Sequence, residues 1–299
     1  MDFRARLYQV APVTGRQFAI FRIALGAYLA VHFAHLMPWG TELFSRQGVL
    51  AKASLSPIHG ILPNVLAWWD SPAAVTAFLS AMVVCSVLFA MGVARRSMAG
   101  ILWYGWACLF NRNVLISNTG IPYVGLLLLL TTLVPPAEPR RFRRADRNPA
   151  EFHVPLMVWV AAWVLMAAGY TFGGIVKLQS PSWVNGTAMW HLLNNPLTRP
   201  GFLRDIAVAL PARAIALMTW VLLTLEVVFL PLALWRVTRP FIWTAMLCTQ
   251  AVFMILVGSA DLTAPMLMLH LFTFDPRWVP RRQIRPAPLQ NRWTPVQIG

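Results

Sequence analysis

The chain has 299 residues, of which 58% are hydrophobic and only 12% carry a charged side chain. A soluble domain of this length carries about twice that share of charged residues, so the composition excludes an ordinary soluble protein. The formal net charge of +15 does not require a nucleic-acid partner, because the positions of the basic residues account for it.

Eight apolar segments are predicted to form transmembrane helices, since about 20 apolar residues in a helix cross the hydrocarbon core of a bilayer. The predicted fold is therefore an all-α polytopic transmembrane helix bundle over residues 1–275, followed by a basic, Pro- and Arg-rich cytoplasmic tail at 276–299. In chain order the segments are 17–37, 72–92, 97–116, 120–136, 153–177, 212–235, 240–258 and 261–275.

The distribution of basic residues predicts the orientation. If the N-terminus lies in the cytoplasm, 17 Lys and Arg residues fall on the cytoplasmic side and 7 on the outer side. Basic residues in short loops favour the cytoplasmic side, so both ends of the chain are predicted to lie inside. We expect an integral protein of a bacterial cytoplasmic membrane, surrounded by membrane lipids, with no nucleic-acid partner.

Lys177 ends the fifth apolar segment and is one of only two lysines, against 23 arginines. Lysine can act as a base when it is desolvated, whereas arginine effectively cannot. Tyr170 lies seven residues earlier on the same helix face, and Gly173 one turn earlier would allow a close approach. A lysine that extends its ammonium to the headgroups is the structural alternative.

Other polar residues are predicted at the same outer depth. Arg112 and Asn111 lie near the end of the third segment, and Asn118 opens the return to the fourth. His32 and His35 lie in the outer third of the first segment, either binding a substrate or lipid or forming a hydrogen-bonded pair within the bundle. Arg112 is expected to lie near Lys177, where it would stabilise developing negative charge and favour the neutral amine.

Glu226, Gln250 and His270 are predicted near mid-membrane, as one buried polar network. Such a network could be structural or could conduct protons. Trp183 and His191 follow Lys177 in a loop expected to cover the outer site, with Trp183 anchored at the interface. The usual set of metal ligands is not evident in the sequence, so no metal is expected.

Four stretches of the chain form a recognisable set: FRIALGAYLAVHFAHLMPWGTELFSRQGVL (21–50), NRNVLISNTG (111–120), YTFGGIVKLQSPSWVNGTA (170–188) and LTLEVVFLPLAL (223–234). The third, with its Tyr…Gly-x-x-Lys…Trp…Gly-Thr-Ala pattern, is the most specific. Together they resemble the HTTM family, the membrane domain shared with vitamin K-dependent γ-glutamyl carboxylases, and they span most of the chain in the family's order.

The resemblance implies that Lys177 is the base that deprotonates a quinol cofactor similar to vitamin K. The carboxylases carry an Asn-His pair where this chain has Asn118-Thr119, which counts against carboxylation of protein glutamates and leaves quinol chemistry open. They also carry a large luminal domain, which is not expected here. The sequence therefore indicates a membrane enzyme acting on a lipid quinol or a secreted peptide.

A non-catalytic accessory protein is the alternative, serving the maturation or export of a secreted peptide or escorting a partner membrane protein. A transporter ranks last, because paired broken helices in two similar halves are not evident.

Overall fold

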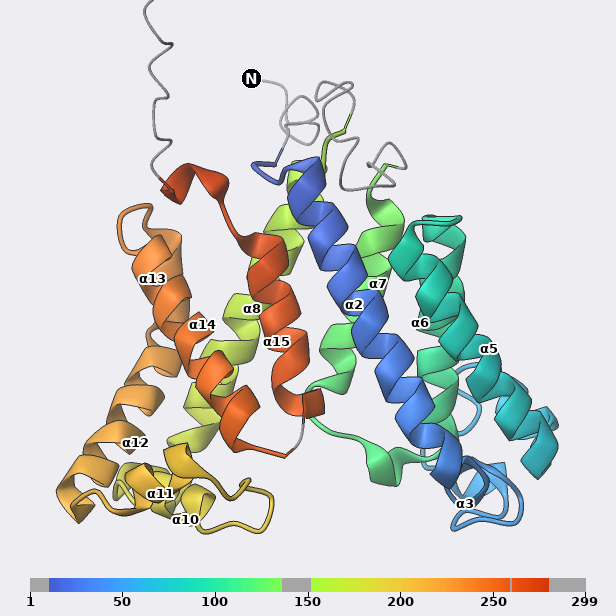
Figure 1. Ribbon diagram of the computed structural model, residues 1–299, viewed down its shortest axis with the longest axis horizontal. Helices are drawn as coiled ribbons and strands as arrows, with labels where there is room; N and C mark the ends of the chain where they lie inside the picture. Colours follow the sequence, from blue (N-terminus) through green and yellow to red (C-terminus); the bar gives the residue numbers. More distant parts are fainter. Residues whose placement is uncertain (1–10, 136–151, 259, 280–299) are drawn as a thin grey trace, which may run out of the picture.

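A computed structural model describes residues 11–135, 152–258 and 260–279 (Figure 1). Within these residues the regular secondary structure is helical, apart from isolated bridge residues such as Thr198 and Val257, which pair in the antiparallel sense. The predicted tail beyond Val279 lies outside the described residues, as do the arginines predicted for the cytoplasmic side at positions 4, 6 and 140–147.

The long helices run side by side from one end of the bundle to the other, and the short helices gather at the end away from Gly15 (Figure 1). The long ones are α2 (Gly15–Leu36), α5 (Pro72–Met91), α6 (Arg95–Arg112), α7 (Ile121–Leu133), α8 (Leu156–Lys177), α12 (Ala212–Val227), α14 (Arg239–Leu256) and α15 (Ala260–Thr273). Helix α13 (Phe229–Leu234) is short, but it follows α12 and lies at the end where α2 begins. The short ones are α3 (Gly40–Phe44), α4 (Val65–Trp68), α9 (Pro181–Val184), α10 (Ala188–Leu193) and α11 (Phe202–Val208).

All eight predicted segments are helical, with two differences in detail. Segment 97–116 ends as an α-helix at Arg112 and continues as a 3-10 turn, and segment 212–235 is two helices, α12 and α13. Among the described residues, four helices are long and apolar enough to cross a membrane, or five if α11 and α12, bent by 111°, count as one span. This class of fold is typical of an integral membrane protein.

Local signals fix the helix ends. Thr14 and Ser71 cap the starts of α2 and α5 by accepting from the Gln17 and Ala74 amides. Helix α5 ends at Gly92, whose φ of 79° is readily adopted only by glycine. These signals place α2 and α5 as neighbours of similar length.

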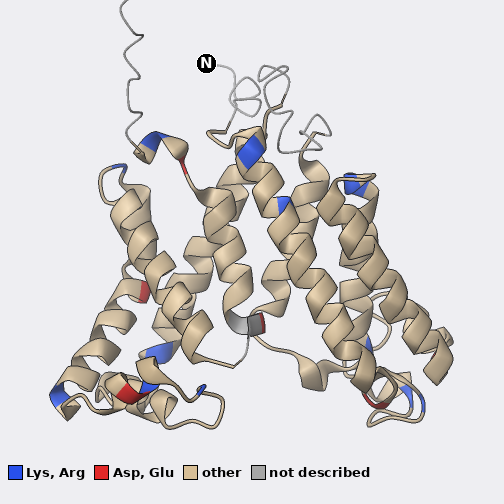
Figure 2. Cartoon of the chain, in the orientation of Figure 1, with Lys and Arg blue, Asp and Glu red and all other residues tan. Residues whose placement is uncertain are grey.

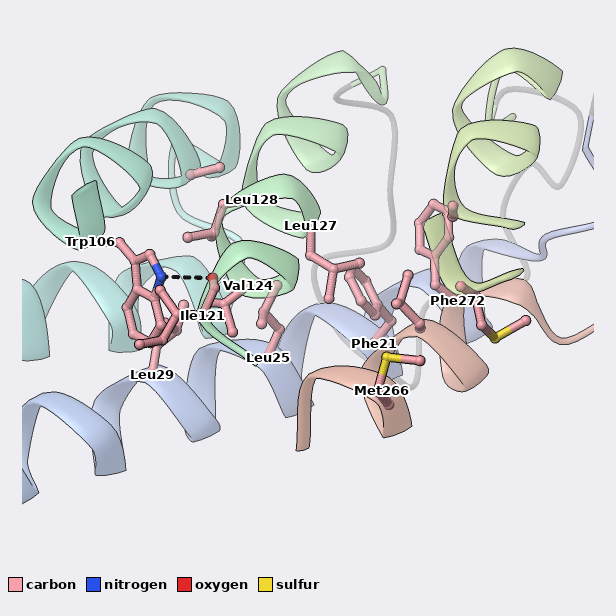
Figure 3. Packing of buried hydrophobic residues seen from close by; sticks show 14 of the residues in the cluster. Phe21, Leu25, Leu29, Trp106, Ile121, Val124, Leu127, Leu128, Met266 and Phe272 are labelled. Carbon is pink, nitrogen blue, oxygen red and sulfur yellow. Dashed lines mark hydrogen bonds between the residues drawn. The ribbon is translucent and has the colours of Figure 1, made fainter. Parts of the chain in front are cut away.

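The largest apolar core joins α2, α6, α7 and α15 (Figure 3). Phe21, Leu25 and Leu29 of α2 are fully buried, and the ring of Phe21 meets Phe272 of α15 at 4.9 Å between centroids. The indole of Trp106 in α6 donates to the Ile121 carbonyl of α7 at 3.1 Å (Figure 3). This core holds the first and last long helices together.

Two buried arginines cap helices at the end where α2 begins. Arg22 donates to the Phe89 and Ala90 carbonyls at the end of α5, and Arg95 donates to the Thr131 carbonyl at the end of α7. The last carbonyls of a helix lack hydrogen-bond partners within the helix and carry partial negative charge. A guanidinium at that end donates hydrogen bonds to them and supplies the opposite charge. Arg22 was predicted to lie within the first span, and this contact explains how it is accommodated.

Helix α12 is broken from α13 at Val228, because Pro231 has no N–H for the Val227 carbonyl and its ring clashes with that turn. The hydroxyl of Thr171 on α8 enters the gap. It accepts from the Leu230 amide at 3.1 Å and donates to the Glu226 carbonyl at 3.3 Å, two groups that would be partners in a continuous helix. The break therefore fixes Glu226 against α8.

Thr171→Val is expected to lower the free energy of unfolding by about 1–2 kcal/mol, because it leaves the Leu230 amide and the Glu226 carbonyl unsatisfied in apolar surroundings. The change is measured by unfolding the protein in mixed micelles that contain an increasing proportion of a denaturing detergent. Thr171→Ser keeps the hydroxyl and serves as the control. Equal stability of the serine and valine variants would show that the hydroxyl does not bridge the gap.

Candidate functional site

Lys177 forms an ion pair with Glu226 of α12. Its ammonium donates to both carboxylate oxygens, at 2.5 Å to Oε1. The lysine side chain is 28% exposed and the glutamate 9%. A pair so enclosed in a membrane-type bundle is held in a low dielectric, where each charge depends on the other. The predicted base, Lys177, is therefore held in an ion pair.

The two helices approach closely at the pair because α8 carries two glycines there. A Cβ added to Gly174 would lie 2.8 Å from the Val227 amide nitrogen and 3.0 Å from the Glu226 Cβ. A Cβ on Gly173 would lie 3.8 Å from Glu226 Oε2. Because helical side chains lean toward the N-terminus of their helix, Lys177 reaches back along this notch to the carboxylate.

Trp183 lies over the amine, with the Lys177 nitrogen 4.7 Å from the ring centroid. This cation–π contact confirms that the loop after Lys177 returns to it. The predicted cover is otherwise incomplete, because His191 is exposed on α10, where its ring contacts that of Trp190 at 5.1 Å between centroids. Lys177 is therefore enclosed by Glu226 on one side and by an indole on another.

Tyr170 lies deeper on α8, with only 4% of the residue exposed. Its ring packs on Phe229 of α13 at 4.8 Å and on His270 of α15 at 5.8 Å between centroids. Gln250 of α14 lies near the hydroxyl, but the pair does not reach hydrogen-bond geometry, so the hydroxyl has no partner among the described residues. Tyr170 is therefore central to the polar residues predicted at mid-membrane.

The structure joins those mid-membrane residues differently from the predicted single network. Glu226 bonds to Lys177, while His270 is fully buried and bonds through Nδ1 to the Met266 carbonyl of its own helix at 2.9 Å. No hydrogen bond links Glu226, Gln250 and His270 within the part of the chain that is described. Tyr170 lies between them instead.

Arg112 does not pair with Lys177 in the structure, which corrects the expected arrangement. It is 1% exposed at the end of α6 and donates to the Ser45 carbonyl at 3.3 Å. Asn111 next to it bonds to Asn64 and to the Ile58 carbonyl. The unit 111–113 therefore organises the loop between α3 and α5, on the far side of α2 and α7 from α8 (Figure 1).

A cavity of about 560 Å³ opens where the end of α2 meets the start of α15. Asp261 is held there by two donors on its Oδ1 atom, the Tyr28 hydroxyl at 2.8 Å and His32 Nδ1 at 3.1 Å. His35 and the loop 196–200 complete the wall. The lining residues are Tyr28, Val31, His32, His35, Pro196, Leu197, Thr198, Arg199, Pro200, Gly258 and Asp261.

His32 has a defined orientation in this cavity. Its side chain is 10% exposed, its ring lies 4.7 Å from that of Trp106, and its Nε2 atom has no partner among the described residues. Donation from Nδ1 to a carboxylate would leave Nε2 as a proton acceptor, the arrangement that orients a general base. His32 and His35, which were predicted to bind a substrate or lipid, thus line a cavity. Lys177 is not among the residues that line it.

Asn118 stabilises the turn that packs against Asp261 of this cavity. Its side chain accepts from the Gly120 amide at 2.8 Å, and the tight turn places Gly120 directly against the backbone of Asp261. Asp261 was not predicted from the sequence. An acid at the start of the last apolar segment was nevertheless a usable signal, because an ionised residue at membrane depth needs a partner. His32, one of those partners, had already been selected.

No family model, curated protein or solved structure matches the chain. The residues that the structure describes contain no cluster of three His, Cys, Asp or Glu side chains able to hold a metal ion. The class of protein therefore rests on the fold, an all-helical bundle with several membrane-length apolar helices.

Proposed function

We propose that the chain is an integral enzyme of the bacterial cytoplasmic membrane with eight spans and both ends inside. It acts at the outer end of the bundle on a lipid-soluble substrate with an acidic hydroxyl, such as a quinol. One feature supports the placement of both ends on one side, since helix α2 begins and α15 ends at the same end of the bundle (Figure 1). Basic residues lie mainly at the two ends of the bundle, as expected of helices that cross a membrane (Figure 2).

The Lys177–Glu226 pair carries the proposal. In a low dielectric, transfer of the ammonium proton to the carboxylate gives a neutral amine beside a neutral acid at little electrostatic cost. The neutral amine then accepts the hydroxyl proton of the substrate, which leaves an oxyanion next to the reformed ammonium. Glu226 makes the neutral amine available by a different route from the one expected of Arg112, because it accepts the ammonium proton, and Trp183 limits access of water to the amine.

The proposal is tested in lipid nanodiscs with a short-chain quinol, following oxygen uptake as the quinolate is oxidised to the quinone. Lys177→Arg keeps the charge paired with Glu226 but cannot supply a neutral base, so quinol-dependent oxygen uptake is expected to fall at least about 10²-fold. The double variant Lys177→Met with Glu226→Leu removes both charges and is also expected to be inactive. Full activity of the arginine variant, or no quinol-dependent uptake by the unmodified chain, contradicts the proposal.

An accessory role in maturing or exporting a secreted peptide is the second candidate, favoured by the cavity at Tyr28, His32 and Asp261, which has hydrogen-bonding walls. The effect of Lys177→Arg distinguishes the two candidate functions. An accessory protein is expected to retain its co-purifying peptide or partner in the Lys177→Arg variant, and mass spectrometry of extracted lipids would find no bound quinone.

A further inference from the structure

A second hollow lies at the opposite end of the bundle from Lys177, where α8 and α14 begin and α13 ends. It is a groove of about 180 Å³ with apolar walls from α8 and α13 and a guanidinium, Arg239, at its end. It shares no residue with the pair at Lys177 or with the cavity at Asp261.

Two indole donors in this groove have no acceptor. Trp159 and Trp163 are 7% and 8% exposed, and the Nε1 atom of each is buried without a hydrogen-bond partner among the described residues. Tryptophan N–H groups usually find a partner when buried, because an unmet donor in apolar surroundings costs free energy. The two rings lie 6.0 Å apart between centroids and both line the groove. Neighbouring atoms cover each N–H, so a bound ligand reaches these donors when the indoles turn toward the groove.

The charge at the end of the groove is positive. The Arg239 guanidinium lies 5.6 Å from the Trp163 ring centroid and donates through Nε to the Ala233 carbonyl at 2.6 Å. Arg236 and Arg277 act on it electrostatically, and so does one acid, Asp275, which is bonded to Arg277 at 2.7 Å. Arg277 is paired with Asp275, so Arg239 in the groove and the nearby Arg236 leave an excess of positive charge that favours an anion.

The walls that lead away from Arg239 are apolar and uncovered. Val164 on α8 and Leu234 on α13 are 61% and 67% exposed, and Val160 and Leu230 beside them are 38% and 41% exposed. In a bilayer such a strip between two helices accommodates an acyl chain. The groove thus combines an anion-binding end, two hydrogen-bond donors and an apolar channel.

We propose that this groove binds an anionic phospholipid of the membrane leaflet at the end of the bundle where α8 begins. The lipid phosphate pairs with Arg239, the indole N–H groups of Trp159 and Trp163 donate to phosphate or ester oxygens, and one acyl chain lies along Val164 and Leu234. This site is independent of the proposed enzymatic function, since it uses none of the same residues.

Native mass spectrometry of the full chain, titrated with phosphatidylglycerol or with phosphatidylcholine of the same acyl chains, tests the proposal. Phosphatidylglycerol is expected to bind about tenfold more tightly than phosphatidylcholine. Arg239→Gln is expected to abolish this preference, Arg239→Lys to retain most of it, and Trp163→Phe to weaken phosphatidylglycerol binding while keeping the ring.

Arg96→Gln is the matched control, because Arg96 lies at the same end and donates through Nε to a carbonyl in the last turn of α7, that of Thr132, at 2.8 Å. It is expected to keep the lipid preference. Equal binding of both lipids by the unmodified chain overturns the proposal, and so does an unchanged preference in the glutamine variant at Arg239. Displacement of the lipid by millimolar inorganic phosphate would show a phosphate-ion site and would overturn it too.

Discussion

Lys177→Met is expected to lower the free energy of unfolding by about 3–5 kcal/mol, the range for breaking a buried ion pair from one side. The glutamate left behind is only 9% exposed and has a short side chain fixed at the break between α12 and α13. It cannot reach water or the headgroups, so it must either stay charged without a partner or take up a proton at neutral pH, and both states cost free energy. Unfolding in mixed micelles measures the loss.

Glu226→Leu is expected to cost less, about 1.5–3 kcal/mol, which is the scale of a lost hydrogen bond to a charged group. Lys177 is 28% exposed at the end of its helix, and its long side chain can turn toward the interface when the carboxylate is gone. The double variant of Lys177→Met and Glu226→Leu is expected to recover most of the loss, since no charge is then buried.

The inequality between the two single variants is the informative result. A larger loss from Glu226→Leu than from Lys177→Met would mean that the amine, and not the carboxylate, is the trapped charge. Additive losses in the double variant would mean that the two residues do not interact in the folded protein. Either outcome would contradict the enclosed pair on which the proposed chemistry depends.

The helices could be predicted from the sequence because apolar runs and their breakers are local signals. Gly92 fixes a helix end that is visible in the sequence itself. The division of segment 212–235 into two helices was missed because a proline in an apolar run can also produce only a kink. The deciding group, the Thr171 hydroxyl, comes from another helix about 60 residues away in the chain.

The site was predicted in part. The rarity of lysine singled out Lys177, and the loop with Trp183 and His191 was expected to cover it. The structure places the Trp183 ring 4.7 Å from the amine but leaves His191 exposed. The partner was assigned by counting residues to equal depth, which chose Arg112 over Glu226. Depth counting ignores the direction in which a helical side chain leans and the helices that stand between two residues, so only packing could identify Glu226.

Gly120→Ala is expected to lower the free energy of unfolding by about 3 kcal/mol, at the upper end of the usual range for overpacking. The added Cβ would overlap the Asp261 carbonyl oxygen and lie 3.0 Å from its carbonyl carbon. The nearest atoms that the Cβ would meet belong to the backbone of Asp261, so the start of α15 must move away from α7. That movement would pull Asp261 from Tyr28 and His32 and open the cavity.

Gly100→Ala is the matched control, because a Cβ there meets no atom within 4 Å and the residue lies inside α6. It is expected to raise stability by about 0.5–1 kcal/mol, the usual gain of alanine over glycine in a helix. Chemical modification of His32, followed by peptide mass spectrometry, reports on the cavity separately from stability. His32 is expected to be modified faster in Gly120→Ala, because its side chain is only 10% exposed when Asp261 is in place. Unchanged stability and unchanged modification of His32 in that variant would show that the turn at Asn118 does not position Asp261.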